Sequence, residues 1–279
     1  MSYKKLQIKD FEKDNYFVSQ ELVDIVNAAL FLDKPLLIEG PAGTGKTYLA
    51  KSLSKMLNKE LIRLQCHEGI DEDKAIYEWD YKKQLLSIQN DKNEKELFTD
   101  EYLIERPILK SLKTFDSLFL VDEIDRSDEE FEALLLEVLA EKQVTIPEIG
   151  TITGEGKNFT ILTSNATRDL SEALRRRCIY FFLDYPSIDI ETKVILSNVE
   201  NISKEKAKKY SLFSSFLRKL NLNKPPSLIE TVEWVKYNHE NNHEELESNI
   251  GILIKDIDDQ KLYKEKLNEN NDFNNKSDT

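Results

Sequence analysis

One stretch of sequence decides the fold: Pro35-Leu-Leu-Ile-Glu39 followed directly by Gly40-Pro-Ala-Gly-Thr-Gly-Lys-Thr-Tyr48. The first five residues predict a short apolar strand, and the spacing of Leu49, Leu53 and Met56 predicts a helix behind the loop. The loop fits the pattern G-x-x-x-x-G-K-[ST], in which glycines let backbone N–H groups turn inward onto phosphate oxygens. The helix N-terminus adds its positive dipole end. A strand, a phosphate loop and a helix in this order predict a nucleotide-binding α/β fold.

The side chains of this loop have expected roles in binding ATP and Mg²⁺. Lys46 would reach the β- and γ-phosphate oxygens, and the hydroxyl of Thr47 would be a ligand of Mg²⁺. We expect the nucleotide to contact Gly40, Pro41, Ala42, Gly43, Thr44, Gly45, Lys46, Thr47 and Tyr48. The alternative is a tight glycine turn without a ligand, and the strand before the loop and the helix behind it argue against that alternative.

Two adjacent carboxylates follow a second apolar strand, Leu118-Phe-Leu-Val121. Ligands of parallel α/β sheets bind at the carboxyl ends of strands, so Asp122 and Glu123 are expected beside the phosphate loop. Asp122 suits the Mg²⁺ shell, and Glu123 is placed to activate or orient a water against the γ-phosphate. An Asp-Glu pair after a strand is by itself usually a solvated turn, but the phosphate loop upstream favours the catalytic interpretation. The acidic residues between 125 and 132 are explained mostly by their favourable place at a helix N-terminus.

The rest of the chain alternates strands with helices and then continues as helices only. A helix is expected over 16–32 with Ser19 as its N-cap, and another after the capping box Ser127-Asp-Glu-Glu130. Further elements are expected as strands at 61–66, 159–163 and 179–183, a hairpin at 144–153, and helices at 188–200, 203–220, 227–238 and 246–268. A second capping box, Ser227-Leu-Ile-Glu230, would begin the third of these helices. This order predicts an αβα sandwich around a parallel five-stranded sheet, followed by a small all-α domain.

Composition and charge restrict the class of protein. The 279 residues include 39 basic and 52 acidic side chains, and the net charge of −13 argues against nucleic acid as the main partner. Mean hydropathy is −0.52, no apolar run approaches the ~18 residues of a membrane-spanning helix, and the N-terminus lacks a signal-peptide core. Cys66 and Cys178 are too few for a disulfide scaffold. We therefore expect a reduced, cytoplasmic protein without a membrane segment.

The stretch His239-Glu-Asn-Asn-His243 matches the zinc-protease pattern H-E-x-x-H, in which two histidines one helical turn apart hold Zn²⁺. Its two asparagines are poor helix formers. Outside the stretch the sequence contains one other histidine, His67. We interpret the stretch as a solvated helix end.

Four motifs together resemble the AAA+ ATPases: the phosphate loop as Walker A, Asp122-Glu123 as Walker B, Thr163-Ser-Asn165 at a strand end, and Leu174-Arg-Arg-Arg-Cys178. More narrowly, the sequence resembles the CoxD-type branch of the MoxR family. The stretches that carry this resemblance are Leu-Ile-Arg-Leu-Gln-Cys-His-Glu-Gly (61–69), Val-Asp-Glu-Ile-Asp-Arg-Ser-Asp-Glu-Glu-Phe-Glu-Ala (121–133) and Ile-Leu-Thr-Ser-Asn-Ala-Thr-Arg (161–168). The resemblance covers residues 16–240.

Carried over residue by residue, the resemblance implies further site residues. Asn165 would be sensor 1, an amide that orients the attacking water beside the γ-phosphate. One arginine of Arg175, Arg176 and Arg177 would be an arginine finger that reaches a neighbouring subunit's nucleotide, with Arg175 and Arg177 favoured. The active unit would then be a homo-oligomer, for which the family implies a hexameric ring. The family's sensor 2 arginine has no counterpart in Lys224-Pro-Pro-Ser-Leu-Ile-Glu230.

The resemblance also implies the domain boundaries. Residues 1–185 would form the AAA+ core, with a helix-2 insert at 67–105 and a pre-sensor-1 hairpin at 143–158. Residues 186–266 would form a helical lid, and the acidic, Asn-rich residues 267–279 a disordered tail. In relatives the two inserts face the pore of the ring or a partner.

The function implied is Mg²⁺-dependent ATP hydrolysis at subunit interfaces, which would drive movement of the two inserts. By the same resemblance the work is chaperone-like maturation or activation of a metalloenzyme or protein complex, with a partner that carries a von Willebrand factor A domain. The CoxD-type likeness points toward a molybdenum hydroxylase as the client. Two alternatives stay open: a nucleic-acid-linked AAA+ motor, which predicts DNA-stimulated turnover, and a nucleotide-regulated binding switch without appreciable turnover.

Overall fold

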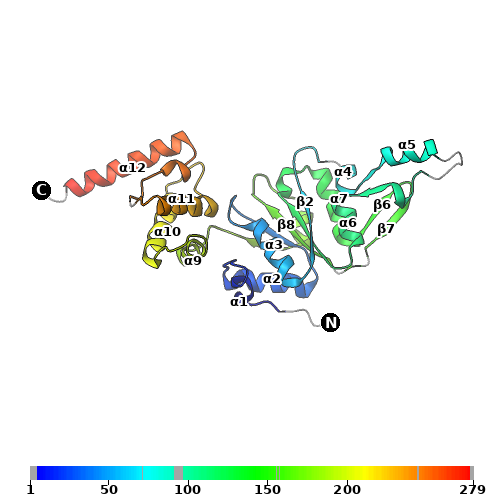
Figure 1. Cartoon of the computed structure of the whole chain (residues 1–279), viewed down its shortest axis with the longest axis horizontal. Coiled ribbons are helices and arrows are strands. Elements are labelled where there is room, and N and C mark those ends of the chain that lie inside the picture. Colours follow the sequence, from blue (N-terminus) through cyan, green and yellow to red (C-terminus); the bar gives the residue numbers. More distant parts are fainter. Residues whose placement is uncertain are drawn as a thin grey trace. The chain divides into compact units, whose positions relative to one another are not determined.

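The computed structural model describes residues 5–70, 72–90, 97–154, 156, 158–243 and 245–276 (Figure 1). The chain forms two compact units. The first contains the residues up to Phe11 together with Ser19–Gly40 and Lys46–Leu183. The second contains Glu12–Val18, Pro41–Gly45 and the chain from Asp184 onward. By its contacts, the middle of the phosphate loop therefore belongs to the second unit.

The first unit is built on a parallel sheet of five strands in the order β2-β5-β8-β1-β9. The strands are β1 (Leu36–Glu39), β2 (Glu60–Gln65), β5 (Ser117–Asp122), β8 (Phe159–Ser164) and β9 (Ile179–Phe182). Every residue of β1 and β5 is buried, as expected for central strands of a sheet that is covered on both faces. The parallel five-stranded sheet predicted from the sequence is confirmed.

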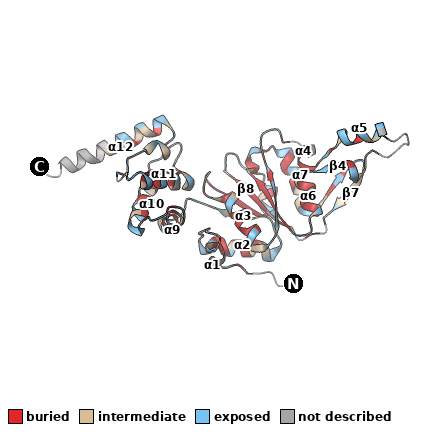
Figure 2. Ribbon diagram, viewed as in Figure 1, coloured by how far each residue is buried: buried red, intermediate tan, exposed pale blue. Residues whose placement is uncertain are grey.

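Helices cover both faces of this sheet. On one side lie α2 (Gln20–Leu32) and α3 (Lys46–Leu57), and on the other lie α6 (Pro107–Lys113) and α7 (Glu129–Glu141) (Figure 1). Two short helices, α1 (Ile8–Glu12) and α8 (Glu172–Arg177), complete this set. Buried residues concentrate in the strands and on the inner faces of these helices (Figure 2). Removal of these apolar faces from water is the main driving force for the αβα arrangement.

Two insertions interrupt the alternation of strands and helices. The first, whose polar sequence gave no clear pattern, contains α4 (Glu72–Ile76), β3 (Tyr77–Trp79), α5 (Tyr81–Asn90), the 3₁₀ turn η1 (Asp100–Tyr102) and β4 (Leu103–Glu105). Strands β3 and β4 pair antiparallel, and Tyr81, Leu85 and Ile88 of α5 are exposed. The second is the antiparallel hairpin of β6 (Gln143–Ile146) and β7 (Gly150–Thr153), which confirms the hairpin expected at 144–153.

The second unit is helical from Asp184 onward. It contains α9 (Ile188–Asn198), α10 (Lys204–Arg218), α11 (Leu228–Glu240), the 3₁₀ turn η3 (Ile250–Ile252) and α12 (Ile257–Lys276). Trp234 is fully buried at its centre, where its ring meets Tyr210 edge-on at 4.9 Å between centroids and stacks on Phe213 at 5.4 Å. The capping box expected at Ser227 and Glu230 is present at the start of α11. The C-terminal helices predicted after the α/β core are confirmed.

Two local predictions were wrong. The N-cap of α7 is Asp128, which accepts from Phe131 N–H at 2.9 Å, because the hydroxyl of Ser127 instead donates to Ile124 O at 2.8 Å in the turn η2 (Ile124–Arg126). The helix expected at 246–268 begins only at Ile257. Helix α12 is assigned from Ile257 to Lys276. The disordered tail expected at 267–279 stays a prediction. Residues 277–279 of the expected tail lie outside the described residues.

Among the described residues, the helices include none with the length and apolar character that crossing a bilayer requires. Cys66 and Cys178 are both buried free thiols.

Candidate nucleotide-binding site

Two glycines of the phosphate loop, Gly40 and Gly43, are required because other residues pack closely against them. A Cβ on Gly40 would lie 2.1 Å from the carbonyl oxygen of Leu183, so the loop can leave β1 only with glycine there. Gly43 has a φ of +76°, and a Cβ on it would lie 2.4 Å from Cβ of Ser227, the N-cap residue of α11. Thr44 is buried, and its hydroxyl donates to Pro41 O at 3.0 Å, which fixes the turn between them.

A tyrosine from outside the loop supports it within the same unit. The hydroxyl of Tyr16 donates to Gly45 O at 3.3 Å, and burial raises the pKa of this phenol above its usual value. Tyr48, expected among the nucleotide contacts, lies in α3 with 42% of its surface exposed. Tyr16 therefore holds the end of the loop that precedes Lys46.

Lys46 begins α3 and is almost completely buried, with 6% exposure. Its Nζ donates to Gly40 O at 2.7 Å, so the ammonium lies across the start of the loop. Burial lowers the pKa of Lys46 to about 8, against the opposing effect of the nearby carboxylates Asp125, Asp122, Glu123 and Glu39. A desolvated cation beside a phosphate loop has the charge needed to bind a polyphosphate.

Asp122 ends β5 with 2% exposure, and several donors converge on its carboxylate. The hydroxyl of Thr47 donates to both oxygens, at 3.0 and 3.1 Å, and the hydroxyl of Thr163 donates to Oδ1 at 2.5 Å. Arg63 of β2 donates to Oδ2 from Nε at 3.0 Å and from Nη2 at 2.6 Å. The expected metal ligands Thr47 and Asp122 are thus in direct contact.

Glu123 follows in the left-handed backbone region, with a φ of 57°. Its N–H donates to the hydroxyl of Thr163 at 2.9 Å, which fixes the unusual backbone. One carboxylate oxygen accepts from Gln65 Nε2 at 3.0 Å and from Arg126 Nη1 at 3.2 Å. The side chain is therefore held by the exposed side chains of Gln65 and Arg126 and remains one-third exposed to solvent.

Asp125 is a member of the site that the sequence analysis missed, because its charge was attributed to a helix N-terminus. It is 3% exposed and accepts from the N–H and the hydroxyl of Thr167, at 3.1 and 2.6 Å. Burial alone would raise the pKa of its carboxyl, but these bonds and the backbone N–H of Asn165 outweigh that effect and lower the pKa. The other oxygen, Oδ1, is buried without a partner among the described residues.

Asn165, the expected sensor 1 residue, directly follows β8 and is half-buried. Strand β8 lies between β5, which carries Asp122, and β1, which leads into the phosphate loop. Its place in the sheet therefore brings Asn165 to the same edge as the two carboxylates.

The three consecutive arginines at the end of α8 have different surroundings. Arg175 donates to Oε1 of Glu39 at 3.1 Å, and its guanidinium lies over the ring of Tyr180 at 5.6 Å. Glu39 is 4% exposed and directly precedes the phosphate loop. Arg176 pairs with exposed Glu172, and exposed Arg177 donates to Leu136 O at 2.9 Å. Of the two arginines favoured as a finger, Arg175 is thus already paired within its own chain.

The H-E-x-x-H stretch does not form a helical pair of histidines. Helix α11 ends at Glu240, and Asn242 has a φ of 55°, so His243 lies outside the helix that carries His239. In the described part of the chain, His, Cys, Asp and Glu side chains do not gather in threes around any point that could hold a metal ion.

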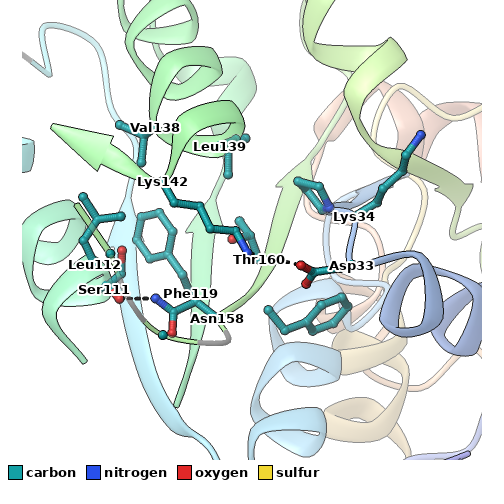
Figure 3. Close-up of a pocket in the computed structure, with 14 residues that line it drawn as sticks. Asp33, Lys34, Ser111, Leu112, Phe119, Val138, Leu139, Lys142, Asn158 and Thr160 are labelled. Carbon is teal, nitrogen blue, oxygen red and sulfur yellow. Dashed lines mark hydrogen bonds and ion pairs between the residues drawn. The ribbon is translucent and has the colours of Figure 1, made fainter. Parts of the chain in front are cut away.

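A separate cavity of about 50 Å³ lies at the opposite end of the sheet strands, near the start of β8 (Figure 3). Lys142 reaches across it to Asp33 at 3.2 Å, and Asn158 donates to Ser111 O. Pockets for drug-sized ligands are usually about 300 Å³ or larger. This cavity is therefore too small to hold a nucleotide.

Comparison with known proteins agrees with the fold and motifs. The family model "AAA domain (dynein-related subfamily)" matches residues 35–178, more than half of the 279-residue chain. An uncharacterised protein of Staphylococcus saprophyticus is 27% identical over 188 residues, which cover 65% of this chain and 67% of that protein. A similar protein of Staphylococcus haemolyticus is 28% identical over 190 residues, covering 66% and 68%.

Among solved structures, a variant of RuvB from Thermotoga maritima superposes with a TM-score of 0.51 at 19% identity. The match covers 81% of this chain and 64% of that one, so the chain spans less than two thirds of the RuvB protein. At this identity the likeness shows the fold alone.

Proposed function

Because the chain belongs to the AAA domain family, dynein-related subfamily, we propose that it binds ATP with Mg²⁺ and hydrolyses it. One observation carries the proposal: a buried lysine ammonium, a Thr-Asp pair and a held glutamate meet where β1 and β5 end. The lysine is desolvated, the pair has the donor set of a magnesium site, and the glutamate has access to solvent. A glycine turn without a ligand needs none of these groups.

The residues present fit Mg²⁺. A hard divalent cation prefers oxygen ligands, and the hydroxyl of Thr47 and the carboxylate of Asp122 are already in contact. Nearby, Asp125 has a buried carboxylate oxygen with no partner in the described residues, a position that a metal-bound water would satisfy. When bound, the ion would neutralise charge on the phosphates.

The chain's own residues then divide the work of hydrolysis. Lys46 binds the β- and γ-phosphate oxygens once its ammonium turns from Gly40 O. Glu123 orients the attacking water and takes its proton after giving up its bonds to Gln65 and Arg126. Asn165 holds the same water from the end of β8.

The finer assignment is a MoxR-type oligomer, supported by the stretches at 61–69, 121–133 and 161–168. In this proposal a hexameric ring in the cytoplasm matures or activates a metalloenzyme or protein complex. It does so with a partner that carries a von Willebrand factor A domain. The two unpaired cysteines fit the reducing compartment.

Steady-state hydrolysis of ATP tests the proposal. We expect wild-type turnover that requires Mg²⁺, loss of nucleotide binding in Lys46→Ala, and retained binding without turnover in Glu123→Gln. Turnover unchanged in Glu123→Gln would exclude this mechanism and favour a nucleotide-regulated switch. Stimulation by duplex DNA would favour the nucleic-acid-linked motor.

A further inference from the structure

Arg63 occupies the carboxylate that the proposed function assigns to the metal. Its guanidinium donates twice to Oδ2 of Asp122, from Nε at 3.0 Å and from Nη2 at 2.6 Å. The hydroxyls of Thr47 and Thr163 donate to the same carboxylate. A carboxylate offers about four lone-pair sites, so the donors present leave no free site for a cation.

The donors differ in how easily they can leave. Thr163 is 1% exposed and also accepts from the N–H of Glu123, so its hydroxyl is fixed in the core. Thr47 is itself an expected metal ligand and has to stay beside Asp122. The side chain of Arg63 is 45% exposed, and its Nη2 also donates to Oε1 of Gln65. Arg63 can therefore move into water and keep a partner, which makes it the exchangeable donor.

We propose that Arg63 is the resident counter-ion of Asp122 and competes with Mg²⁺ for this carboxylate. The inference rests on the proposed function, because it takes Asp122 as the metal ligand. Arg63 has to release Oδ2 before that oxygen can accept a metal ion. The guanidinium thus neutralises a buried charge in the metal-free protein and raises the Mg²⁺ concentration needed to load the site.

Titration with MgCl₂ tests the competition through binding instead of turnover. A fluorescent ATP analogue reports nucleotide binding to wild type and to Arg63→Gln while MgCl₂ is raised from a chelated solution. We expect the half-saturating Mg²⁺ concentration to fall at least about tenfold in Arg63→Gln, because the variant loses both charge-assisted hydrogen bonds to Oδ2. An unchanged or higher half-saturation would overturn the proposal and make Arg63 only a support of the sheet.

Arg126→Gln is the matched control. It removes a guanidinium of the same carboxylate cluster, but that guanidinium contacts Glu123 and leaves every donor of Asp122 in place. We expect its half-saturation to stay close to that of wild type. An equal fall in both variants would show a general charge effect and would also overturn the proposal.

A nucleotide-free measurement separates this inference from the proposed function. Without its counter-ion Asp122 is a buried unpaired charge, so Arg63→Gln should melt below wild type in EDTA. Millimolar MgCl₂ should then raise the melting temperature of Arg63→Gln more than that of wild type. Arg63→Lys, which keeps the charge, should lie between them. If wild type bound no nucleotide, the proposed function would fail, while equal melting shifts would refute the competition itself.

Discussion

At the scale of single residues, the two buried thiols predict how stability depends on pH. Burial raises the pKa of Cys178 from 9.0 to about 12. Above about pH 9 the unfolded chain loses this proton while the folded chain keeps it, so the free energy of unfolding falls as pH rises. The loss for one such thiol is about 1.4 kcal/mol at about pH 10. Urea unfolding of Cys178→Ala should therefore show a shallower fall with pH than that of wild type.

Cys66 supplies the matched comparison. Burial, and then the charges of Asp122, Asp125 and Glu123, raise the pKa of its thiol to about 12 as well. Cys66→Ala should flatten the pH dependence by a similar amount, although its absolute stability differs. If neither alanine variant changed the slope, the thiols would ionise at the same pH in the folded and the unfolded protein. Rapid reaction of native protein with Ellman's reagent at about pH 9 would reveal it.

The site residues that could be predicted are those that belong to a short sequence pattern. Lys46 and Thr47 belong to a fixed pattern, and Asp122 follows an unbroken apolar run, so each could be named before the structure. Arg63 could not, because a charged residue on an alternating strand is normally a solvated one, and its partner is distant in sequence. Asp125 could have been predicted, because it lies one 3₁₀ turn after Asp122 and is buried. Its charge also fits a helix N-terminus, and that interpretation hid its place in the site.

At the scale of elements, one buried ion pair joins α9 to α10. Nη1 and Nη2 of Arg218 donate to the two carboxylate oxygens of Glu191 at 3.0 and 2.7 Å, and the side chains are 6% and 1% exposed. Removing one partner leaves a buried charge, so Arg218→Met should destabilise the helical unit by about 3–5 kcal/mol. Adding Glu191→Leu should recover much of that loss. Trp234 fluorescence in a Trp79→Phe background would follow this unit alone.

The exposed pair of Arg176 and Glu172 is the control for this prediction. Both side chains are more than three-quarters exposed and lie one turn apart on α8. Glu172→Gln should change the free energy of unfolding by less than about 0.5 kcal/mol. If Arg218→Met were equally mild, water would have to reach Glu191 in the folded state.

Sequence patterns predicted most of the strands but misplaced the ends of two helices. Strands β1, β5 and β8 were predictable because each is short, largely apolar and bounded by polar residues. The cap of α7 was misplaced by one residue, since Ser127 and Asp128 are both good caps and only the preceding 3₁₀ turn decides between them. The start of α12 was missed because residues 246–256 have helical apolar spacing but fold as turns, with Asn249 at a φ of 59°.

At the scale of the whole molecule, the arginines of α8 bear on the proposed oligomer. Arg175 is paired with buried Glu39 in its own chain, whereas Arg177 is exposed and bonded only to a backbone carbonyl among the described residues. The loss of Arg175 would leave buried Glu39 without its cation at the start of the phosphate loop, a defect within one chain. Arg177 is therefore the better candidate for a residue that acts on a neighbouring subunit's nucleotide.

Mixing inactive variants tests this assignment. Arg177→Ala and Glu123→Gln should each lack turnover alone, but a mixture should regain it. In the mixture a Glu123→Gln subunit can supply its arginine to a site whose own glutamate is intact. A mixture of Lys46→Ala with Glu123→Gln should stay inactive, because Lys46 and Glu123 belong to one site of one chain. Recovery in the second mixture would show that mixing restores turnover without a shared arginine and would overturn this reading of the first mixture. No recovery in the first mixture would exclude Arg177 as the shared arginine.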